Sequence, residues 1–450
     1  MLAASCNPKF SVNKSTVVLS YVTYFFQYGT GLLVLPVILQ NLDADSVALW
    51  YTFLSIFSLV SLLDFGFSPS IQRSVTYVFS GSDELLEEGY SVNAGNEVNA
   101  NLLSSLIYTG KYIYKILSIV ILLLMSTLGL VYFNNCAQGD VINIDFIITW
   151  FLYSLSTAIY FYYNWILSFV RGRGQIKEYN YIIVIGKLLF LVILILLVML
   201  DYGLLSLVIA NFINTIAQIV MGRLFFFDKK VKLILSRSHS KPKNLYNIIK
   251  KNAVNSGIVS IGVFLLSQAG VFLSNFFLPL YEVAQLGVTL QVFGVLVVLS
   301  RVYLTTNVPR ISSLWIINNK QSISNIFYKS QLIGYIIFFT GVVGVIFCGN
   351  FLLEKVVHSN VLLPTNYVIL LYALFYFMEL THGNCCTVIS TSNYIPFTTA
   401  SIISGSTSVV CTIVFAKLGL GIISFPLALC CGSLPYNSWK WPVVLYKMLK

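Results

Sequence analysis

The sequence predicts an all-α polytopic membrane protein with about twelve transmembrane helices, in two six-helix bundles with pseudo-two-fold symmetry along the membrane normal. Of its 450 residues, 57% are hydrophobic and only 10% are charged, whereas soluble domains carry about 25% charged residues. Runs such as Leu188–Leu200 are apolar at every position. They lack the alternation of a transmembrane β-strand and fit helices of about 20 residues, which cross a hydrocarbon core of about 30 Å.

The first half contains six apolar runs, each ended by a polar connection. The predicted spans cover residues 15–38, 47–66, 106–132, 144–169, 179–200 and 203–226. One set of connections is acidic and contains Asp43, Asp45, Asp140, Asp145 and Asp201. The alternate set is basic and contains Lys9, Lys14, Arg73, Lys111, Lys115, Arg171, Arg173 and Lys177.

The second half repeats this alternation. Its predicted spans cover residues 253–278, 284–306, 332–353, 361–381, 396–416 and 420–438. Glu282 lies on the acidic side, where Lys355 and Lys417 add the only positive charges. The basic side contains Arg310, Lys320, Lys329, Lys440, Lys447 and Lys450.

The alternation also predicts orientation. Cytoplasmic loops of membrane proteins collect Lys and Arg, so the basic connections are assigned to the cytoplasm, and an even number of spans places both termini there. The net charge of +11 follows from these loops, and we expect no nucleic-acid partner.

A basic central segment divides the two halves. We expect an N-terminal six-helix bundle at 1–227, a basic cytoplasmic linker at 228–251 and a C-terminal six-helix bundle at 252–450. Two interpretations of the linker stay open. It sets the orientation and touches anionic membrane lipid, or it has a specific binding role.

Loop lengths and motifs argue against an enzyme. The predicted outer connections are too short to hold the acid and base groups of an outward-facing sugar polymerase or acyltransferase. No Walker-type glycine loop is present, so ATP-driven transport is not expected. The cysteines form no Cys-x-x-Cys pair and the three histidines are scattered, so no metal or other cofactor is predicted.

Lys187 is the charge that departs most clearly from this pattern. It lies about ten residues into the fifth span, near the middle of the bilayer at a rise of 1.5 Å per residue. A central lysine costs about 2.5–3.5 kcal/mol on insertion scales, and such residues usually face a bundle interior or a watery cavity. We expect Lys187 to line a cavity that accepts an anionic substrate group. The alternative is a lysine that reaches the interface or a helix carbonyl.

Two pairs of charged residues, one in each half, have the same spacing. Asp64 precedes Arg73 by nine residues at the predicted end of the second span, and Arg301 precedes Arg310 by nine residues at the predicted end of the eighth. We expect Asp64 and Arg301 to form a charge pair in a cytoplasmic gate, with Arg73 and Arg310 beside it. The alternatives are independent interfacial charges and plain orientation anchors.

Glu379 and His382 form another candidate pair. They lie one helical turn apart, and we expect them at the end of the tenth span, where they can share a helix face. A histidine titrates near neutral pH, so the pair is a candidate for proton coupling; the alternative is an ordinary interfacial helix terminus. The aromatic residues Tyr21, Tyr24, Phe25, Phe26 and Tyr28 line a sugar path or pack against lipid and other helices.

Several stretches resemble a known family. LWYTFLSIFSLVSLLDFGFSPSIQR at Leu49–Arg73, RGRGQIKEYN at Arg171–Asn180, MELTHGNCCTVISTSNYIPF from Met378 and YNSWKWPVVLYKML from Tyr436 resemble Wzx-type O-antigen flippases and related polysaccharide exporters of the MATE-like superfamily. The likeness extends over the whole chain in span number. The first span departs from the lipid II flippases of this superfamily, because it carries no interior Arg or Lys.

The resemblance implies a flippase of the bacterial inner membrane. Its substrate would be an undecaprenyl-diphosphate-linked oligosaccharide, an O-antigen or capsule repeat unit, moved to the periplasmic leaflet by alternating access of two bundles around a cationic cavity. A polysaccharide polymerase and a chain-length regulator would be partners. Two other readings stay open: a MATE-type ion-coupled small-molecule exporter, and an integral-membrane polymerase or acyltransferase.

Overall fold

The chain is helical throughout its regular structure. The computed structural model describes residues 13–41, 44–89, 97–131, 144–267, 269–355 and 362–450. Within those ranges, nine helices are long and apolar enough to cross a membrane, which confirms the predicted fold class. The chain forms two compact units, here called the N-terminal unit and the C-terminal unit; the main division follows Lys251, and Glu88 and Gly89 group with the C-terminal unit.

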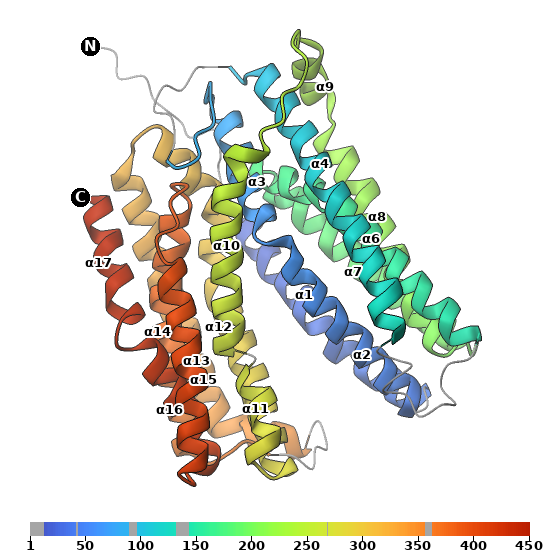
Figure 1. The fold of residues 1–450 in the computed structure, drawn as a ribbon, viewed down its shortest axis with the longest axis vertical. Helices are drawn as coiled ribbons and strands as arrows, with labels where there is room; N and C mark the ends of the chain where they lie inside the picture. Colours follow the sequence, from blue (N-terminus) through green and yellow to red (C-terminus); the bar gives the residue numbers. More distant parts are fainter. Residues whose placement is uncertain (1–12, 42–43, 90–96, 132–143, 268, 356–361) are drawn as a thin grey trace. The chain divides into compact units, whose positions relative to one another are not determined.

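The N-terminal unit is a bundle of long helices, drawn in blue to green in Figure 1. Its helices are α1 (Lys14–Asn41), α2 (Ala44–Ser61), α3 (Phe67–Phe79), α4 (Ala100–Leu124), α6 (Ile144–Gly172), α7 (Ile176–Val198), α8 (Leu204–Phe226) and α9 (Lys229–Ser236). A π-helical segment, η2 (Met125–Gly129), continues α4. Helix α6 packs against α3, α4 and α8, and α7 packs against α1 and α8. Phe53 anchors the core, with ring centroids 4.8 Å from Trp150 and 5.0 Å from Tyr153.

The second predicted span breaks before its expected end. Helix α2 stops at Ser61, a single 3₁₀ turn, η1 (Leu62–Asp64), follows, and Phe65 and Gly66 adopt left-handed backbone angles with φ of 43° and 73°. The Asp64 carboxylate accepts a hydrogen bond from the backbone N–H of Ser68 at 3.2 Å. It therefore satisfies a first-turn donor of α3, which has no partner within its own helix.

The C-terminal unit, drawn in yellow-green to red in Figure 1, is also a bundle of helices. They are α10 (Tyr246–Ser267), α11 (Ala269–Phe277), α12 (Leu280–Ile316), α13 (Lys320–Lys355), α14 (Asn366–Ser390), α15 (Thr398–Lys417), α16 (Ser424–Ser433) and α17 (Asn437–Leu449), with a 3₁₀ turn, η3 (Gly421–Ile423). The seventh predicted span is divided between α10 and α11, and the twelfth between α16 and α17. The Phe293 and Tyr376 rings stack in the core with centroids 5.2 Å apart.

The two units repeat the same packing scheme. Helix α7 packs on α8 as α15 packs on α16, and α3 packs on α6 as α12 packs on α14. The region from Ala44 to Phe79, with its break, has its counterpart in the single helix α12, which runs from Leu280 to Ile316. The equal spacing of charged residues in the two halves of the sequence therefore coincides with a repeat of helix order and packing.

The basic segment 228–251 groups with the N-terminal unit and includes the start of α10, residues 246–251. Asp228 begins it: its carboxylate accepts hydrogen bonds from Arg173 at 2.8 Å and from the backbone N–H of Val231 at 2.9 Å. Partial burial by itself raises the pKa of Asp228, but these hydrogen bonds and the nearby cations Arg173 and Lys230 outweigh it, so the pKa lies below its ordinary value. Asp228 thereby caps α9 and fixes it to the end of α6.

An extended run then follows one face of α4. Asn101 accepts hydrogen bonds from the Ser238 hydroxyl and from two backbone N–H groups, those of His239 and Ser240. Four and eight residues further along α4, Ser105 accepts from the Lys243 N–H at 3.0 Å and Thr109 from the Leu245 N–H at 2.8 Å. The segment expected to be a linker is therefore docked on α4 by its backbone.

Candidate functional site

Lys187 lies at the middle of α7, eleven residues from each end of the helix. Its Nζ is 5.7 Å from the centroid of the Phe190 ring, a cation–π distance. No ion pair joins it to a carboxylate in the described part of the chain. Lys187 is therefore at mid-helix, as its place in the apolar run predicted, and its role in holding an anionic substrate group stays a prediction.

Lys187 borders a cavity of about 320 Å³ inside the N-terminal unit, called here the deep cavity. Five helices, α1, α2, α6, α7 and α8, contribute to its wall. Its lining residues are Gln27, Trp50, Leu54, Phe57, Tyr153, Ser156, Thr157, Tyr160, Ile183, Lys187, Phe190, Asn211, Asn214, Thr215 and Gln218. Its size falls in the range of about 300–1,000 Å³ that small-ligand sites occupy.

Helix α8 supplies a polar wall. Asn211, Asn214, Thr215 and Gln218 are spaced so that they share one face of the helix, and the Gln218 amide donates to the Asn214 side-chain oxygen at 2.9 Å. A Cβ atom on Gly186 of α7 would lie 2.5 Å from that oxygen. Glycine therefore lets the α7 backbone approach the amides next to Lys187.

Helices α2 and α6 supply an aromatic wall. The Trp50 and Tyr153 rings meet edge to face with centroids 6.1 Å apart, and those of Phe57 and Tyr160 lie 6.0 Å apart. The lining of the deep cavity therefore combines aromatic rings with side-chain amides.

A second cavity of about 290 Å³ adjoins the deep cavity and is called here the outer cavity. Gln27, Phe57, Tyr160 and Ile183 line both. Asp64 and Arg171 are charged residues of the outer cavity. Asp64 accepts a hydrogen bond from the Tyr114 hydroxyl at 2.7 Å, and the Arg171 guanidinium lies over the Tyr179 ring at 4.7 Å.

The four predicted gate residues are distributed over both units. Asp64 and Arg73 belong to the N-terminal unit, and Arg301 and Arg310 belong to the C-terminal unit. The pairing of Asp64 with Arg301 therefore stays a prediction. Arg301 does not end a span: α12 continues fifteen residues beyond it. Its guanidinium Nε donates to the Asn384 side-chain oxygen of α14 at 3.1 Å.

Arg73 and Arg310 differ from plain surface anchors. Arg73 is 5% exposed, and its Nη2 donates to the Ser70 hydroxyl at 3.1 Å. In both arginines the buried Nε has no hydrogen-bond partner among the described residues. Neither residue lines the deep or the outer cavity.

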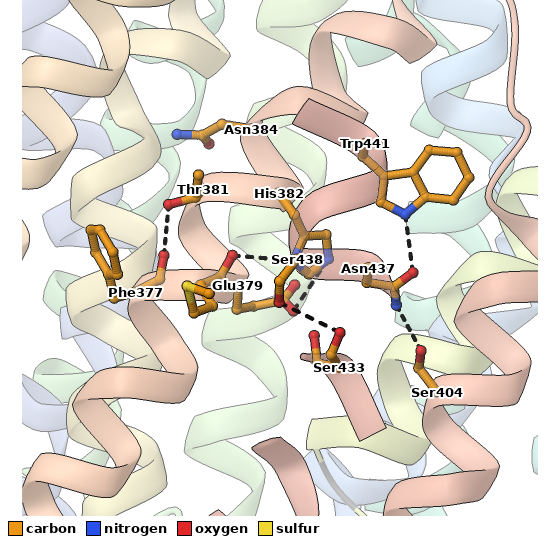
Figure 2. A network of polar contacts seen from close by, with 12 residues as sticks. Phe377, Glu379, Thr381, His382, Asn384, Ser404, Ser433, Asn437, Ser438 and Trp441 are labelled. Atoms are coloured by element: carbon orange, nitrogen blue, oxygen red, sulfur yellow. Dashed lines mark hydrogen bonds and ion pairs between the residues drawn. The ribbon is translucent and has the colours of Figure 1, made fainter. Parts of the chain in front are cut away.

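Glu379 and His382 lie inside α14, not at a helix end (Figure 2). The helix continues to Ser390, and within it the Thr387 hydroxyl donates to the Gly383 carbonyl at 2.9 Å. The His382 Nε2 lies 3.4 Å from a Glu379 carboxylate oxygen, and the Nδ1 lies 3.2 Å from the Met378 carbonyl. This corrects their predicted position at a terminus. The proton-coupling role stays a prediction.

A chain of polar contacts links α12, α13 and α14. Asn384, which accepts from Arg301, donates to Gln331 of α13 at 2.9 Å, and Gln331 lies 3.4 Å from the Thr381 carbonyl. The Thr381 hydroxyl is 3.0 Å from that of Tyr335. The C-terminal unit therefore holds a polar cluster that contains Arg301. The cation that lines the deep cavity of the N-terminal unit is instead a lysine, Lys187.

The sequence did not single out the polar lining of the deep cavity. The signal was present in the apolar run at 203–226, where Asn211, Asn214 and Gln218 recur at helical spacing. Four described members of the aromatic cluster predicted in the first span line neither cavity: Tyr21, Tyr24, Phe25 and Phe26. Phe25 of that cluster is 56% exposed, and the side chain of Tyr28 lies outside the described part of the structure.

Comparison with known proteins identifies the fold. No family model and no curated protein sequence matches the chain. The fold matches the outward-facing conformation of a multidrug resistance MATE family transporter of the MOP superfamily, at 12% identity and TM-score 0.76, covering 100% of this chain and 99% of the other. A MATE structure in the bent conformation matches at 11% identity and TM-score 0.73, covering 96% and 93%.

A third structure is a MOP superfamily transporter from Pyrococcus furiosus, for which a binding pocket of reverse polarity is described. It matches at 12% identity and TM-score 0.65, covering 98% of this chain and 96% of the other. The whole chain therefore has the fold of MATE structures of the MOP superfamily. At these identities the likeness concerns the fold.

Proposed function

We propose that this chain is a flippase that moves an undecaprenyl-diphosphate-linked oligosaccharide, an O-antigen or capsule repeat unit, across the bacterial inner membrane by alternating access. The termini face the cytoplasm, and a polysaccharide polymerase and a chain-length regulator act after it. The fold of transporters, rather than of membrane enzymes, supports the proposal. So do the basic connections that alternate with acidic ones along the chain.

The deep cavity is the observation that carries the proposal. It combines a mid-helix lysine that forms no ion pair among the described residues with amide and aromatic walls. Neither Asp nor Glu is among its lining residues. Such a site favours an anionic, polyhydroxylated substrate over a cation, because an unpaired ammonium repels cations and attracts phosphate or carboxylate.

The first test replaces Lys187 by methionine. Export should fail, because the cationic group is lost. The protein should become more heat-stable, because a lysine near the centre of a bilayer costs about 2.5–3.5 kcal/mol. The control is Lys177→Met: Lys177 lies on the same helix, with its Nζ 5.8 Å from the Tyr181 ring, but it is exposed and lines neither cavity.

The assay uses a strain in which the gene is deleted and each variant is supplied in turn. Undecaprenyl-linked repeat units are extracted and measured by mass spectrometry, surface polysaccharide is measured on gels, and protein levels are matched by immunoblot. The deletion and Lys187→Met should accumulate the lipid-linked unit, whereas Lys177→Met should not. Normal surface polysaccharide in the deletion strain, with no second flippase present, would falsify the proposal.

A second candidate function, ion-coupled export of small molecules, rests on Asp64. Its carboxylate lines the outer cavity, and a carboxylate there can bind a cation or a proton. Efflux of a cationic dye from whole cells distinguishes the two functions. Dye efflux that requires Asp64 and is independent of Lys187 supports the exporter. Accumulation of lipid-linked repeat units in the deletion strain, without any change in dye efflux, supports the flippase.

A further inference from the structure

Helix α9 presents a basic surface at one end of the N-terminal unit, beside the start of α4 (Figure 1). Val231 is fully buried, whereas Lys229, Lys230 and Lys232 are exposed. Leu233 is 59% exposed although it is apolar. At about 100° of rotation per residue, Lys229, Lys232 and Leu233 lie on the side of the helix opposite Val231. The three lysines and Leu233 are called here the α9 surface.

Hydrogen bonds on both sides of α9 hold it in place. Before the helix, Asp228 joins its first turn to Arg173 at the end of α6. After the helix, the run 238–245 is bonded to α4 through its backbone N–H groups. A mobile loop loses conformational freedom when it binds a partner, and a segment that is already fixed avoids most of that loss. The α9 surface is therefore preorganised for binding.

The charges of the three lysines are not balanced by nearby carboxylates. None of the three forms an ion pair within the described part of the chain. Asp228 is the only acidic residue of the segment 228–251, and its carboxylate is already bonded to Arg173 and to the backbone of α9. Arg237 differs, because it lies 3.6 Å from Glu97, and it is not counted in the α9 surface. The surface therefore attracts an anionic partner.

The α9 surface lies close to the end of a helix that is long and apolar enough to cross a membrane. That helix is α8, which ends at Phe226, three residues before α9 begins. Leu224, in its last turn, is 70% exposed, as lipid-facing residues are. Charges attract each other over about 8 Å at physiological ionic strength. An exposed leucine among lysines suits a surface that offers both anionic headgroups and apolar chains.

We infer that the α9 surface binds anionic phospholipids of the adjacent membrane leaflet. The lysines contact the headgroup phosphates, and Leu233 contacts the acyl chains next to them. Basic loops in general orient a membrane protein, whereas this inference assigns a lipid site to one fixed helix. Because α9 is joined to the ends of α6 and α8, the bound lipid holds those ends at the membrane surface. The inference does not depend on which substrate is transported.

Two lipids with identical acyl chains test the inference: phosphatidylglycerol, which is anionic, and phosphatidylcholine, which has no net charge. The full chain is purified in a neutral detergent and titrated with each lipid, and the bound lipid is counted by native mass spectrometry. The tightest phosphatidylglycerol site should bind at least about tenfold more strongly than phosphatidylcholine, because each lysine near an anionic surface raises affinity about fivefold. This preference should shrink as the salt concentration is raised.

Charge variants locate the site on α9. The triple variant Lys229→Gln, Lys230→Gln and Lys232→Gln should weaken phosphatidylglycerol binding by about ten- to a hundredfold and leave phosphatidylcholine binding unchanged. The corresponding triple arginine variant keeps the charge and should bind as the unaltered protein does. The matched control replaces three lysines in or next to α17, which the sequence assigns to the same side of the membrane: Lys440→Gln, Lys447→Gln and Lys450→Gln. It should leave the tightest site intact.

A change at Leu233 tests the contact with the acyl chains. Leu233→Ser keeps all three lysines and alters an exposed position, so folding should be unaffected. It should weaken phosphatidylglycerol binding by about three- to tenfold. Binding of glycerol 1-phosphate, which carries the phosphate without acyl chains, should not change.

Three results would overturn the inference. The first is equal affinity of the unaltered protein for the two lipids. The second is an equal loss of phosphatidylglycerol binding in the α9 and α17 glutamine variants, which would mean that any basic segment binds these lipids. The third is glycerol 1-phosphate binding as tightly as phosphatidylglycerol, which would indicate a site for a soluble phosphate. None of these measurements involves transport, so the flippase function and the lipid site can fail separately.

Discussion

Replacing Gly186 by alanine should separate α7 from α8 beside the deep cavity. The added Cβ would lie 2.5 Å from the Asn214 side-chain oxygen and 3.0 Å from the Gln218 Cγ, whereas carbon atoms in good contact lie about 3.5–4.0 Å apart. Either the two side chains rotate, which breaks the hydrogen bond between them, or the helices move apart. Both responses alter the wall next to Lys187.

The expected loss of stability follows from three contributions. Overpacking costs about 1–3 kcal/mol, and losing the hydrogen bond between Gln218 and Asn214 costs about 1 kcal/mol. Alanine is favoured over glycine in a helix by about 1 kcal/mol, which offsets the second contribution. The free energy of unfolding of Gly186→Ala should therefore be lower by about 1–3 kcal/mol.

Unfolding in mixed micelles, followed by tryptophan fluorescence as denaturing detergent is added, measures this difference. The control is Gly344→Ala, because a Cβ on Gly344 of α13 meets no atom within 4 Å. That variant should be neutral or slightly more stable than the unaltered protein. The reasoning is refuted if both alanine variants shift the unfolding free energy by the same amount in the same direction.

Three further predictions concern features outside the cavities. Asp228→Asn should destabilise the protein at neutral pH, where the carboxylate with its lowered pKa is charged and bonded. The difference in unfolding free energy from the unaltered protein should shrink as the pH falls below about 4. Unfolding curves taken from pH 7 to pH 3 measure it. Ser105→Ala combined with Thr109→Val should release the backbone of 238–245 from α4 and speed trypsin cleavage there. Thr127→Val, which removes a hydroxyl bonded to its own helix, should leave the cleavage rate unchanged. Gly66→Ala should lower the unfolding free energy by about 1–2 kcal/mol, because an alanine resists a left-handed backbone; an unchanged value would mean that the break between α2 and α3 relaxes.

The general architecture could be predicted because a bilayer imposes simple constraints. An apolar run of sufficient length becomes a helix in lipid whatever its neighbours are. The mid-helix position of Lys187 could be estimated for the same reason, from its distance to the ends of the run. The internal repeat was visible in the spacing of Asp64, Arg73, Arg301 and Arg310, since both copies keep the same helix order.

The ends of spans that contain several polar residues could not be predicted in the same way. Hydropathy placed the end of the tenth span near Glu379, yet α14 continues through Ser390. The polar residues that lower the hydropathy there have partners inside the unit: Asn384 bonds to Arg301 and Gln331, and the Thr387 hydroxyl bonds to the Gly383 carbonyl. These partners come from other helices or from backbone atoms, and neither is visible in a hydropathy profile.

The docking of the basic segment was missed for a related reason. Its charges indicated a cytoplasmic position, but the hydrogen bonds that hold it use backbone N–H groups. Those donors are the same in every non-proline residue, so composition does not reveal them. Only the acceptors, Asn101, Ser105 and Thr109, follow a recognisable spacing, one helical turn apart.

The difference between the interrupted α2–α3 segment and α12 has a practical consequence for measuring motion. Phe65 and Gly66 interrupt one copy of the repeat, whereas the matching residues Val302 and Tyr303 lie within an unbroken stretch of α12. Spin labels placed on either side of residues 302–303 should therefore report one narrow distance distribution. Labels on α2 and α3 report on the break at Phe65 and Gly66. The distance distribution measured across α12 therefore serves as an internal reference for bending between α2 and α3.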